Sequence, residues 1–143
     1  YAMCAIAGSG KDSYIRQHLA HLPMLSLDEI RRERKLDPAD SKHTAEAVRL
    51  GKEQAKEYLR ARTSFVFNAT NLNRDLRSKW LPMFADYGAR VHLIYLEVPY
   101  TRLLSQNRNR EHSVPNDVLH RMIEKLEIPD YSEAHTVDFV VSS

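Results

Sequence analysis

Short apolar segments alternate along this chain with longer stretches in which apolar and charged residues are mixed. The apolar segments have the length of strands, and their nearly continuous apolar character is typical of strands buried on both faces. They cover Tyr1–Ala7, Met24–Leu27, Ser64–Ala69, Arg90–Val98 and Val137–Val141. We therefore predict a sheet of five strands.

The mixed stretches have helical spacing. One face of a helix over residues 39–62 would carry Ala45, Val48, Ala55 and Leu59. A single helix is predicted between Asn73, a typical N-cap, and Gly88, a typical C-terminal residue. Others are expected over residues 11–22, 100–110 and 116–127. Strands that alternate with helices predict an α/β fold, a parallel sheet with helices on both faces.

Composition narrows the class of protein. The 143 residues fit a single domain, residues 1–143, and the net charge of +2 is too small to indicate a nucleic-acid partner by itself. No apolar run approaches the roughly 20 residues of a membrane helix, and no secretory leader is evident. The one cysteine, Cys4, suits the reducing cytoplasm. Because the chain starts at Tyr1, we expect it to be part of a longer protein.

The sequence AGSGK, residues 7–11, lies between the first predicted strand and the first predicted helix. Ligands of parallel sheets bind at the carboxyl ends of strands, and amide groups at a helix N-terminus attract phosphate. A lysine at this place can reach the β- and γ-phosphates of ATP. The predicted ATP-binding residues of this loop are Gly8, Ser9, Gly10, Lys11, Asp12 and Ser13.

This loop departs from the P-loop pattern G-x-x-x-x-G-K-[ST] at two positions. Ala5 stands at the first glycine position, and Asp12 stands where a serine or threonine would hold Mg²⁺. A carboxylate can bind Mg²⁺ directly or through water, so Asp12 is the first candidate metal ligand. Ser13, the next residue, is the second candidate.

Asp28 and Arg31 follow the second predicted strand, one helical turn apart. A carboxylate beside the phosphates can take the proton of an attacking hydroxyl group. The arginine can hold an anionic group of the acceptor. From spacing alone, a helix cap at Asp28 and a surface arginine are an equally good interpretation.

A run of polar residues follows the third predicted strand at the same edge of the sheet. Asn68, Thr70 and Asn71 can bind phosphate, ribose or one another there. Trp80, farther along, is predicted to lie in the core rather than to stack on a base.

Residues 107–119, NRNREHSVPNDVL, have the composition of a lid. Its arginines, Arg108 and Arg110, would contact the phosphates of ATP and neutralise charge that develops during phosphoryl transfer. A solvated basic turn is the alternative.

Taken together, these stretches resemble the polynucleotide 5′-hydroxyl kinase family of P-loop phosphotransferases. The closest similarity is to bacterial kinase modules fused to an HD-type phosphohydrolase in RNA repair. The motifs that carry the resemblance span nearly the whole chain and are GSGK, SLDEIR, NATNLNRDLR, ADYGARVHLIYLEVPYTRLLSQNRNRE, VPNDVL and EAHTV.

The resemblance implies an enzyme with a P-loop kinase fold and an arginine-bearing lid that uses ATP and Mg²⁺ to phosphorylate 5′-OH ends, of RNA ahead of DNA. It also implies that the parent chain carries a phosphohydrolase domain. The implied catalytic residues are Lys11, Asp28 as general base and Arg110. Arg31, Thr70 and Asn71 would contact the nucleic acid together with Asp28.

Three positions differ from the phage-type members of that family. Asp12 replaces a serine or threonine, Ala69 replaces an acidic residue, and Gln106 replaces a lid arginine for which Arg108 can substitute. The HD-fused branch is more similar at these places. Two other functions stay open, a P-loop kinase of small molecules and a nucleotide-binding module without catalysis.

Overall fold

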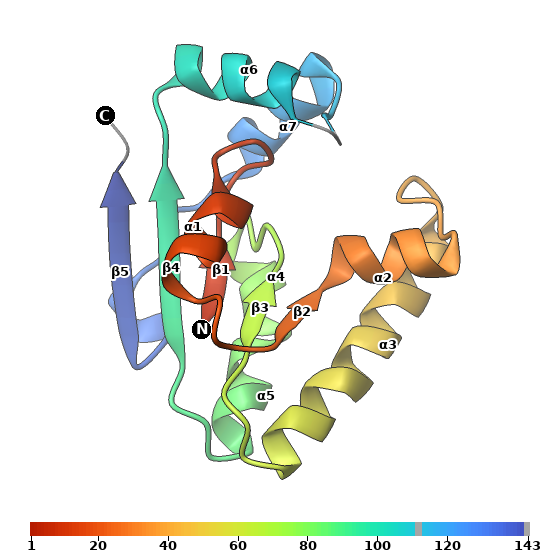
Figure 1. Ribbon diagram of the computed structural model, residues 1–143, viewed down its shortest axis with the longest axis vertical. Helices are drawn as coiled ribbons and strands as arrows, with labels where there is room; N and C mark the ends of the chain where they lie inside the picture. Colours follow the sequence, from red (N-terminus) through yellow and green to blue (C-terminus); the bar gives the residue numbers. More distant parts are fainter. Residues whose placement is uncertain (111–112, 142–143) are drawn as a thin grey trace.

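The computed structural model describes residues 1–110 and 113–141, and the five predicted strands form one parallel sheet in it (Figure 1). They are β1 (Ala2–Cys4), β2 (Met24–Ser26), β3 (Val66–Asn68), β4 (His92–Glu97) and β5 (Thr136–Val141). The first four are shorter than the apolar segments that predict them. The apolar residues outside the strands lie at the strand ends, in loops or, for Leu27, in the first turn of α2.

The strand order is β2-β3-β1-β4-β5, with every neighbouring pair parallel. The chain therefore changes direction across the sheet at β1, the point where parallel α/β sheets bind ligands. Ser26 pairs with Asn68 and Cys4 with Tyr95, so the ends of these strands lie at one edge of the sheet. The predicted fold class is confirmed.

The helices are α1 (Lys11–His18), α2 (Leu27–Arg34), α3 (Ser41–Arg60), α4 (Arg74–Ser78), α5 (Leu81–Asp86), α6 (Tyr100–Asn109), α7 (Asn116–Lys125) and the 3₁₀ helix η1 (Tyr131–Glu133). The prediction of one helix between Asn73 and Gly88 is wrong, because the helix is interrupted between α4 and α5. Pro82, which cannot donate a backbone hydrogen bond, lies in the first turn of α5. Asn73 does cap α4, accepting from the amide of Leu76 at 2.9 Å.

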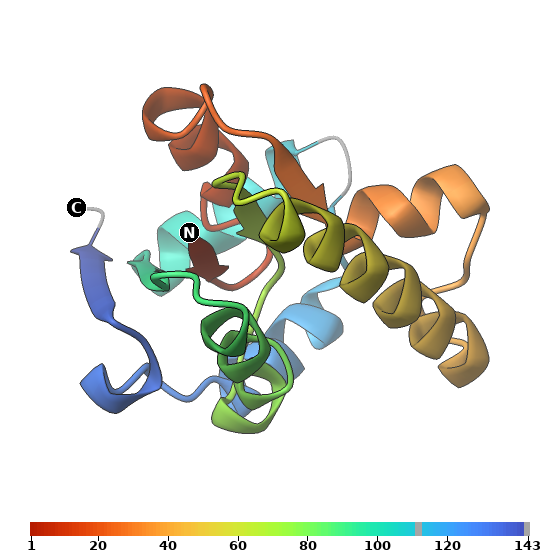
Figure 2. The same cartoon turned by 90° about the horizontal axis from the view of Figure 1, so that it is seen from below.

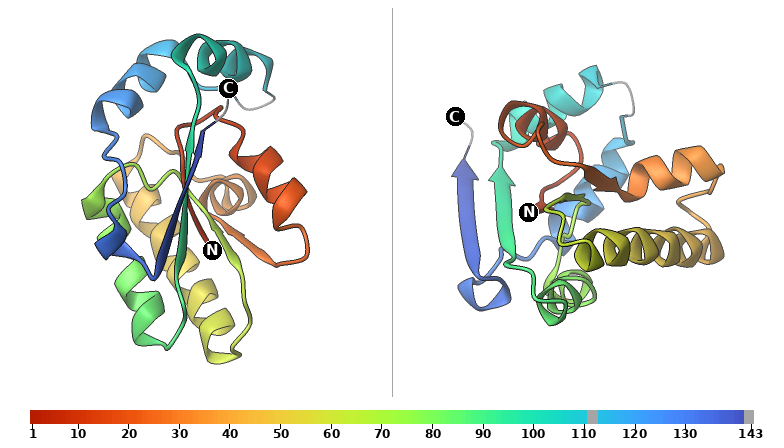
Figure 3. Two further views of the ribbon diagram at one scale, coloured as in Figure 1. Left: turned by 90° about the vertical axis from the view of Figure 1, so that its left-hand side faces the viewer. Right: turned by 60° about the horizontal axis from the view of Figure 1, so that its bottom comes forward.

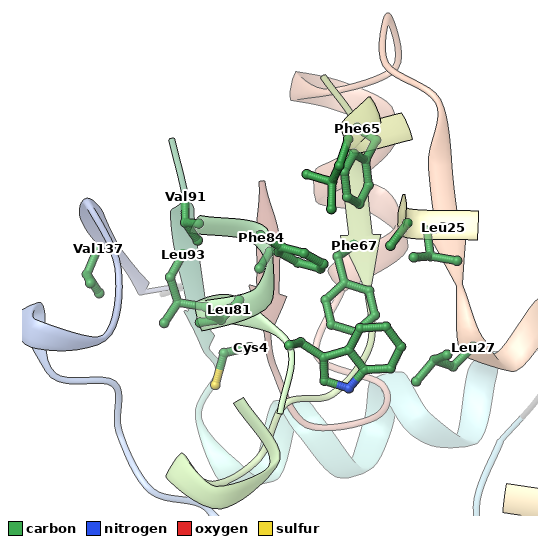
Figure 4. Packing of buried hydrophobic residues seen from close by; sticks show 14 of the residues in the cluster. Cys4, Leu25, Leu27, Phe65, Phe67, Leu81, Phe84, Val91, Leu93 and Val137 are labelled. Carbon is green, nitrogen blue, oxygen red and sulfur yellow. The ribbon is translucent and has the colours of Figure 1, made fainter. Parts of the chain in front are cut away.

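Helices cover both faces of the sheet, as the views in Figures 2 and 3 show. On one face Met3 and Ala5 pack with Ile15 and Leu19, around α1. On the other face Ala2 and Cys4 belong to a larger aromatic cluster with side chains of α3 and α5, part of which Figure 4 shows. Alternate residues of β1 thus serve two cores, which is why the segment is apolar throughout.

Trp80 lies in this larger core, 5% exposed and packed against Phe67 and Phe84, as predicted. The predicted buried face of α3 needs a correction, because Ala45 is exposed and the buried residues are Ala47, Gly51, Ala55 and Leu59. A Cβ at Gly51 would lie 2.8 Å from Leu27 Cδ2. The glycine therefore lets α3 approach α2 closely.

A buried ion pair joins α4 to η1. The Arg77 side chain is 1% exposed and its Nε donates to Glu133 Oε1 at 2.7 Å. Arg77 Nη1 also donates to the carbonyl of Asn71 at 2.8 Å. Cys4 Sγ lies 3.5 Å from the same guanidinium, and burial raises the pKa of this thiol to about 11. The cysteine is therefore an inert core residue.

Across residues 1–110 and 113–141, none of the helices combines the length and apolar character that a membrane span requires.

Candidate active site

The loop between β1 and α1 has the backbone of an anion-binding loop. Gly8 and Gly10 have φ angles of 82° and 95°, in the left-handed region that glycine adopts most readily. The amide of Ser9 donates to the carbonyl of Ile6 at 3.1 Å, and α1 begins at Lys11. The first amide groups of α1 have no intrahelical partner, so this N-terminus attracts phosphate.

Charged side chains converge on Lys11. Its side chain is largely withdrawn from solvent, and the residue is 8% exposed. Burial lowers the pKa of Lys11; the charges of Asp28 and Asp12 oppose this shift, and that of Arg110 adds to it. Charged groups from three separate parts of the sequence therefore act on one another at this edge of the sheet.

An open cavity of about 940 Å³ lies beside the loop. Its walls come from the loop, from α1, from the end of β4 and from α6. Asp12, Ser13 and Arg110 are among the lining residues. The cavity is large enough for a nucleotide.

Helix α6 packs directly on the glycine loop. A Cβ on Gly8 would lie 3.0 Å from Cβ of Asn107. With its amide turned to satisfy both neighbours, Gln106 donates to the carbonyl of Gly8 at 2.9 Å and accepts from Arg102 at 3.1 Å. The sequence did not suggest this role for Gln106, which the resemblance to polynucleotide kinases assigns to the position of a lid arginine.

The lid predicted over residues 107–119 is described only in part, because 111–112 lie outside the described residues. Asn107 is 1% exposed and bonds both backbone groups of Val114, at 2.7 and 3.1 Å. Arg110, the C-cap residue that follows α6, lines the cavity, whereas Arg108 is exposed. The role of both arginines stays a prediction.

On the acceptor side, Asp28 lies in the first turn of α2, which begins directly after β2. The helix cap is Ser26, whose hydroxyl accepts from the amide of Glu29 at 3.2 Å, so Asp28 is not needed as a cap. Arg31 Nη1 donates to Asp28 Oδ1 at 3.0 Å. The Asp28 side chain is 55% exposed, and Arg31 Nε is buried without a partner among the described residues.

The loop after β3 differs from the prediction at Asn71. Its side chain is buried and donates to the carbonyl of Met3 at 2.7 Å, and its φ is 47°. This corrects the expectation that Asn71 faces the acceptor, because its amide fixes the loop to β1. Thr70 is half-buried, and its carbonyl accepts from the amide of Ala5 at 3.0 Å.

Asn68, at the end of β3, reaches the glycine loop instead. Its Nδ2 donates to Asp12 Oδ1 at 3.0 Å across 56 residues of sequence. The sequence placed Asn68 at the correct edge of the sheet. It did not reveal the partner, since local spacing says nothing about which loops meet in space.

The residues present fit a magnesium ion bound together with phosphate. Asp12 is exposed, lines the cavity and supplies the carboxylate oxygen that Mg²⁺ prefers. Ser13, also on the cavity wall, accepts from Arg16 Nη2 at 3.2 Å. Within the described part of the chain, no three His, Cys, Asp or Glu residues form a metal cluster. Sparse protein ligation is usual for Mg²⁺ held largely by substrate phosphates.

Comparisons with known proteins agree with this geometry. The chain matches the family model described as AAA domain over residues 1–129. A search of the curated proteins finds no match.

Solved structures with the same fold include kinases of small molecules. A sugar kinase from Janibacter sp. HTCC2649 superposes with a TM-score of 0.72 at 17% identity, over 98% of this chain and 83% of that one. A gluconokinase from Sinorhizobium meliloti 1021 superposes with a TM-score of 0.64 at 18% identity, over 98% of this chain and 80% of that one. A shikimate kinase from Bacteroides thetaiotaomicron superposes with a TM-score of 0.56 at 16% identity, over 95% of this chain and 83% of that one. At such identities the likeness shows the fold, that of the P-loop kinases.

Proposed function

This chain belongs to the AAA domain family, and we propose that it is a P-loop kinase that transfers the γ-phosphate of ATP to a hydroxyl group of a small-molecule acceptor. The observation that carries the proposal is the glycine loop with buried Lys11 at the start of α1, beside a nucleotide-sized cavity that Asp12 and Arg110 line. A glycine-rich turn without a ligand would not need these charges together.

Each of these residues has a distinct task in the proposed reaction. The loop amides and Lys11 hold the phosphates, and Arg110 offsets negative charge on the transferring group. Asp28 accepts the proton of the acceptor hydroxyl group. The oxygen of that hydroxyl group attacks the γ-phosphorus, and ADP leaves. Asp12 would hold Mg²⁺, which would supply further neutralisation of the phosphate charge.

The acceptor class follows from Arg31 and from the similar structures. Arg31 points its guanidinium at Asp28, so an acceptor hydroxyl beside Asp28 lies next to a positive charge. A small hydroxy compound with a carboxylate or phosphate group would use that charge. The proteins named above are kinases of a sugar, of gluconate and of shikimate, which are compounds rich in hydroxyl groups.

A 5′-OH polynucleotide end is the second candidate acceptor. The exposure of Asp28, 55% of its side chain, favours it, because the end of a long strand can reach an open site. The sequence resemblance points the same way. None of the similar structures named above is a polynucleotide kinase, so this finer assignment, and a fused phosphohydrolase, rest on the resemblance.

A panel of acceptors separates the two candidates. ADP release is followed with sugars, sugar acids and other hydroxy acids, and with RNA and DNA oligonucleotides bearing 5′-OH ends. Saturable, Mg²⁺-dependent turnover with a small hydroxy compound supports the first candidate. Turnover only with oligonucleotides replaces it with the second, and ATP binding without any turnover indicates a non-catalytic module.

We predict that Arg31→Ala raises the KM for the acceptor by about 10–100-fold, the loss expected for a charged hydrogen bond. The KM for ATP should change by less than about twofold, since Arg31 is not among the residues lining the nucleotide cavity. Steady-state kinetics with both substrates varied provides the measurement. Arg34→Ala, an exposed arginine on the same helix, is the matched control. Equal effects on both KM values would indicate a structural role for Arg31.

A further inference from the structure

The contact between Asp12 and Asn68 joins the first turn of α1 to the end of β3. Asn68 is 7% exposed, whereas Asp12 is exposed and lines the cavity. The donor is Nδ2 of the buried amide, and the acceptor is Oδ1 of the carboxylate, 3.0 Å away. A buried side chain therefore holds an exposed one in place.

In the observed orientation of its amide, Asn68 has one buried polar atom without a hydrogen-bond partner among the described residues. That atom is Oδ1. A buried acceptor without a partner destabilises the fold. Turning the amide over would place this oxygen against a carboxylate oxygen, so the observed orientation serves Asp12.

This hydrogen bond assigns separate tasks to the two oxygens of Asp12. Oδ1 accepts from Asn68, and within the described chain no other hydrogen bond reaches the carboxylate. Oδ2 is therefore left for a ligand in the cavity. The restraint on Oδ1 fixes the direction in which Oδ2 points.

P-loop enzymes usually hold Mg²⁺ with a hydroxyl of the loop and an aspartate from outside it. Here the loop supplies the carboxylate, Asp12, and the adjacent strand end supplies an uncharged amide, Asn68. We infer that the two roles are exchanged in this chain: Asn68 is a positioning residue that orients Asp12 as the carboxylate for the nucleotide-bound cation. The inference rests on the proposed function.

Binding of Mn²⁺ in the presence of ADP tests the inference without turnover. Electron paramagnetic resonance of free Mn²⁺ gives the cation affinity of the ADP complex, and calorimetry in EDTA gives the affinity for ADP alone. Asn68→Ala should weaken Mn²⁺ binding by about 10–100-fold, as loss of a residue that orients a metal ligand does. Affinity for ADP in EDTA should change by less than about twofold, because the loop amides and Lys11 are intact.

The reciprocal variants distinguish an exchange of roles from a structural contact. Asn68→Asp alone places two carboxylates at hydrogen-bond distance. Asp12→Ser alone removes the carboxylate and should weaken Mn²⁺ binding by about 10-fold or more. Asp12→Ser combined with Asn68→Asp restores one hydroxyl and one carboxylate. This double variant should bind Mn²⁺ more tightly than either single variant, and Asn116→Ala, exposed and outside the cavity, should match the wild type.

Two results would overturn the inference: unchanged Mn²⁺ affinity in Asn68→Ala, or a double variant that binds no better than Asp12→Ser. Thermal melting identifies any Asn68 variant that fails to fold. In that case Asp12→Asn, a change at an exposed residue, decides the matter, because unchanged Mn²⁺ affinity in that variant also contradicts the inference. If the wild-type chain binds no ADP even in EDTA, the proposed function itself fails, together with the inference that rests on it.

Discussion

Asparagine in place of Asp28 should lower the rate of phosphoryl transfer by about 10²–10⁴-fold, the range for loss of a general base. The amide side chain has the same shape as the carboxylate but does not take a proton from the acceptor hydroxyl. Affinity for ATP should stay within about twofold, because the loop amides and Lys11 bind the phosphates. Single-turnover transfer, with ATP binding measured separately by calorimetry, provides both values.

Glu29→Gln is the matched control for this prediction. Glu29 is an exposed carboxylate on the same turn of α2, and its backbone amide, rather than its side chain, bonds to Ser26. Its replacement should leave transfer unchanged. Transfer at the wild-type rate in Asp28→Asn would remove the base assignment, and equal losses in both variants would point to a general effect of charge.

The largest expected change in stability comes from breaking the buried ion pair of Arg77 and Glu133. Glu133→Ala should lower the free energy of unfolding by about 3–5 kcal/mol, because it leaves a buried guanidinium without its charged partner. That is a large fraction of the roughly 5–15 kcal/mol that stabilises a typical domain. The melting temperature should fall by about 10–20 °C.

Glu124→Ala provides the control, because Glu124 is exposed on α7 and surface substitutions usually change stability by less than about 0.5 kcal/mol. Chemical unfolding of both variants gives the comparison. The substitution Glu133→Ala should also loosen the loop after β3, because Arg77, which loses its partner, donates through Nη1 to the carbonyl of Asn71. A free energy of unfolding within about 1 kcal/mol of the wild type, on the order of a surface change, would mean that Arg77 finds other partners.

The same ion pair makes a contribution to stability that depends on pH. Burial opposes the charge of Glu133, but hydrogen bonds from Arg77 and from the amide of Asp130 prevail and lower its pKa from the ordinary value of a glutamate. A carboxyl group with a lowered pKa in the folded state stabilises the fold above its unfolded pKa. This contribution is lost as the pH falls through the folded pKa. The stability difference between the wild type and Glu133→Gln should therefore shrink as the pH falls below about 4.

Much of this fold follows from local pattern. The segment Tyr1–Ala7 is apolar because β1 faces two cores. The loop that follows has positive φ angles at Gly8 and Gly10, which glycine adopts most readily. Asn73 and Pro82 are both visible in the sequence, but the prediction of one helix rests on the cap alone. It therefore lacks the break between α4 and α5.

The local sequence pattern does not predict contacts between loops that are distant in the sequence. Asn71 has a polar side chain in a loop, which is typical of a ligand contact, yet the loop turns this side chain inward to Met3. The pairing of Asp12 with Asn68 depends on the position of α1 relative to β3, which no spacing encodes. The helical spacing assigns Ala45 to the buried face, but small apolar residues fit either side of a helix, and Ala45 is exposed.

The central claim, phosphoryl transfer at this site, is tested most directly with γ-labelled ATP and a mixture of hydroxy compounds and 5′-OH oligonucleotides. Label bound covalently to an acceptor distinguishes transfer from hydrolysis. The account predicts label on one acceptor class that requires Mg²⁺ and disappears in Lys11→Ala and Asp28→Asn. Label that persists in Asp28→Asn, or none on any acceptor while ATP binds tightly, would contradict it.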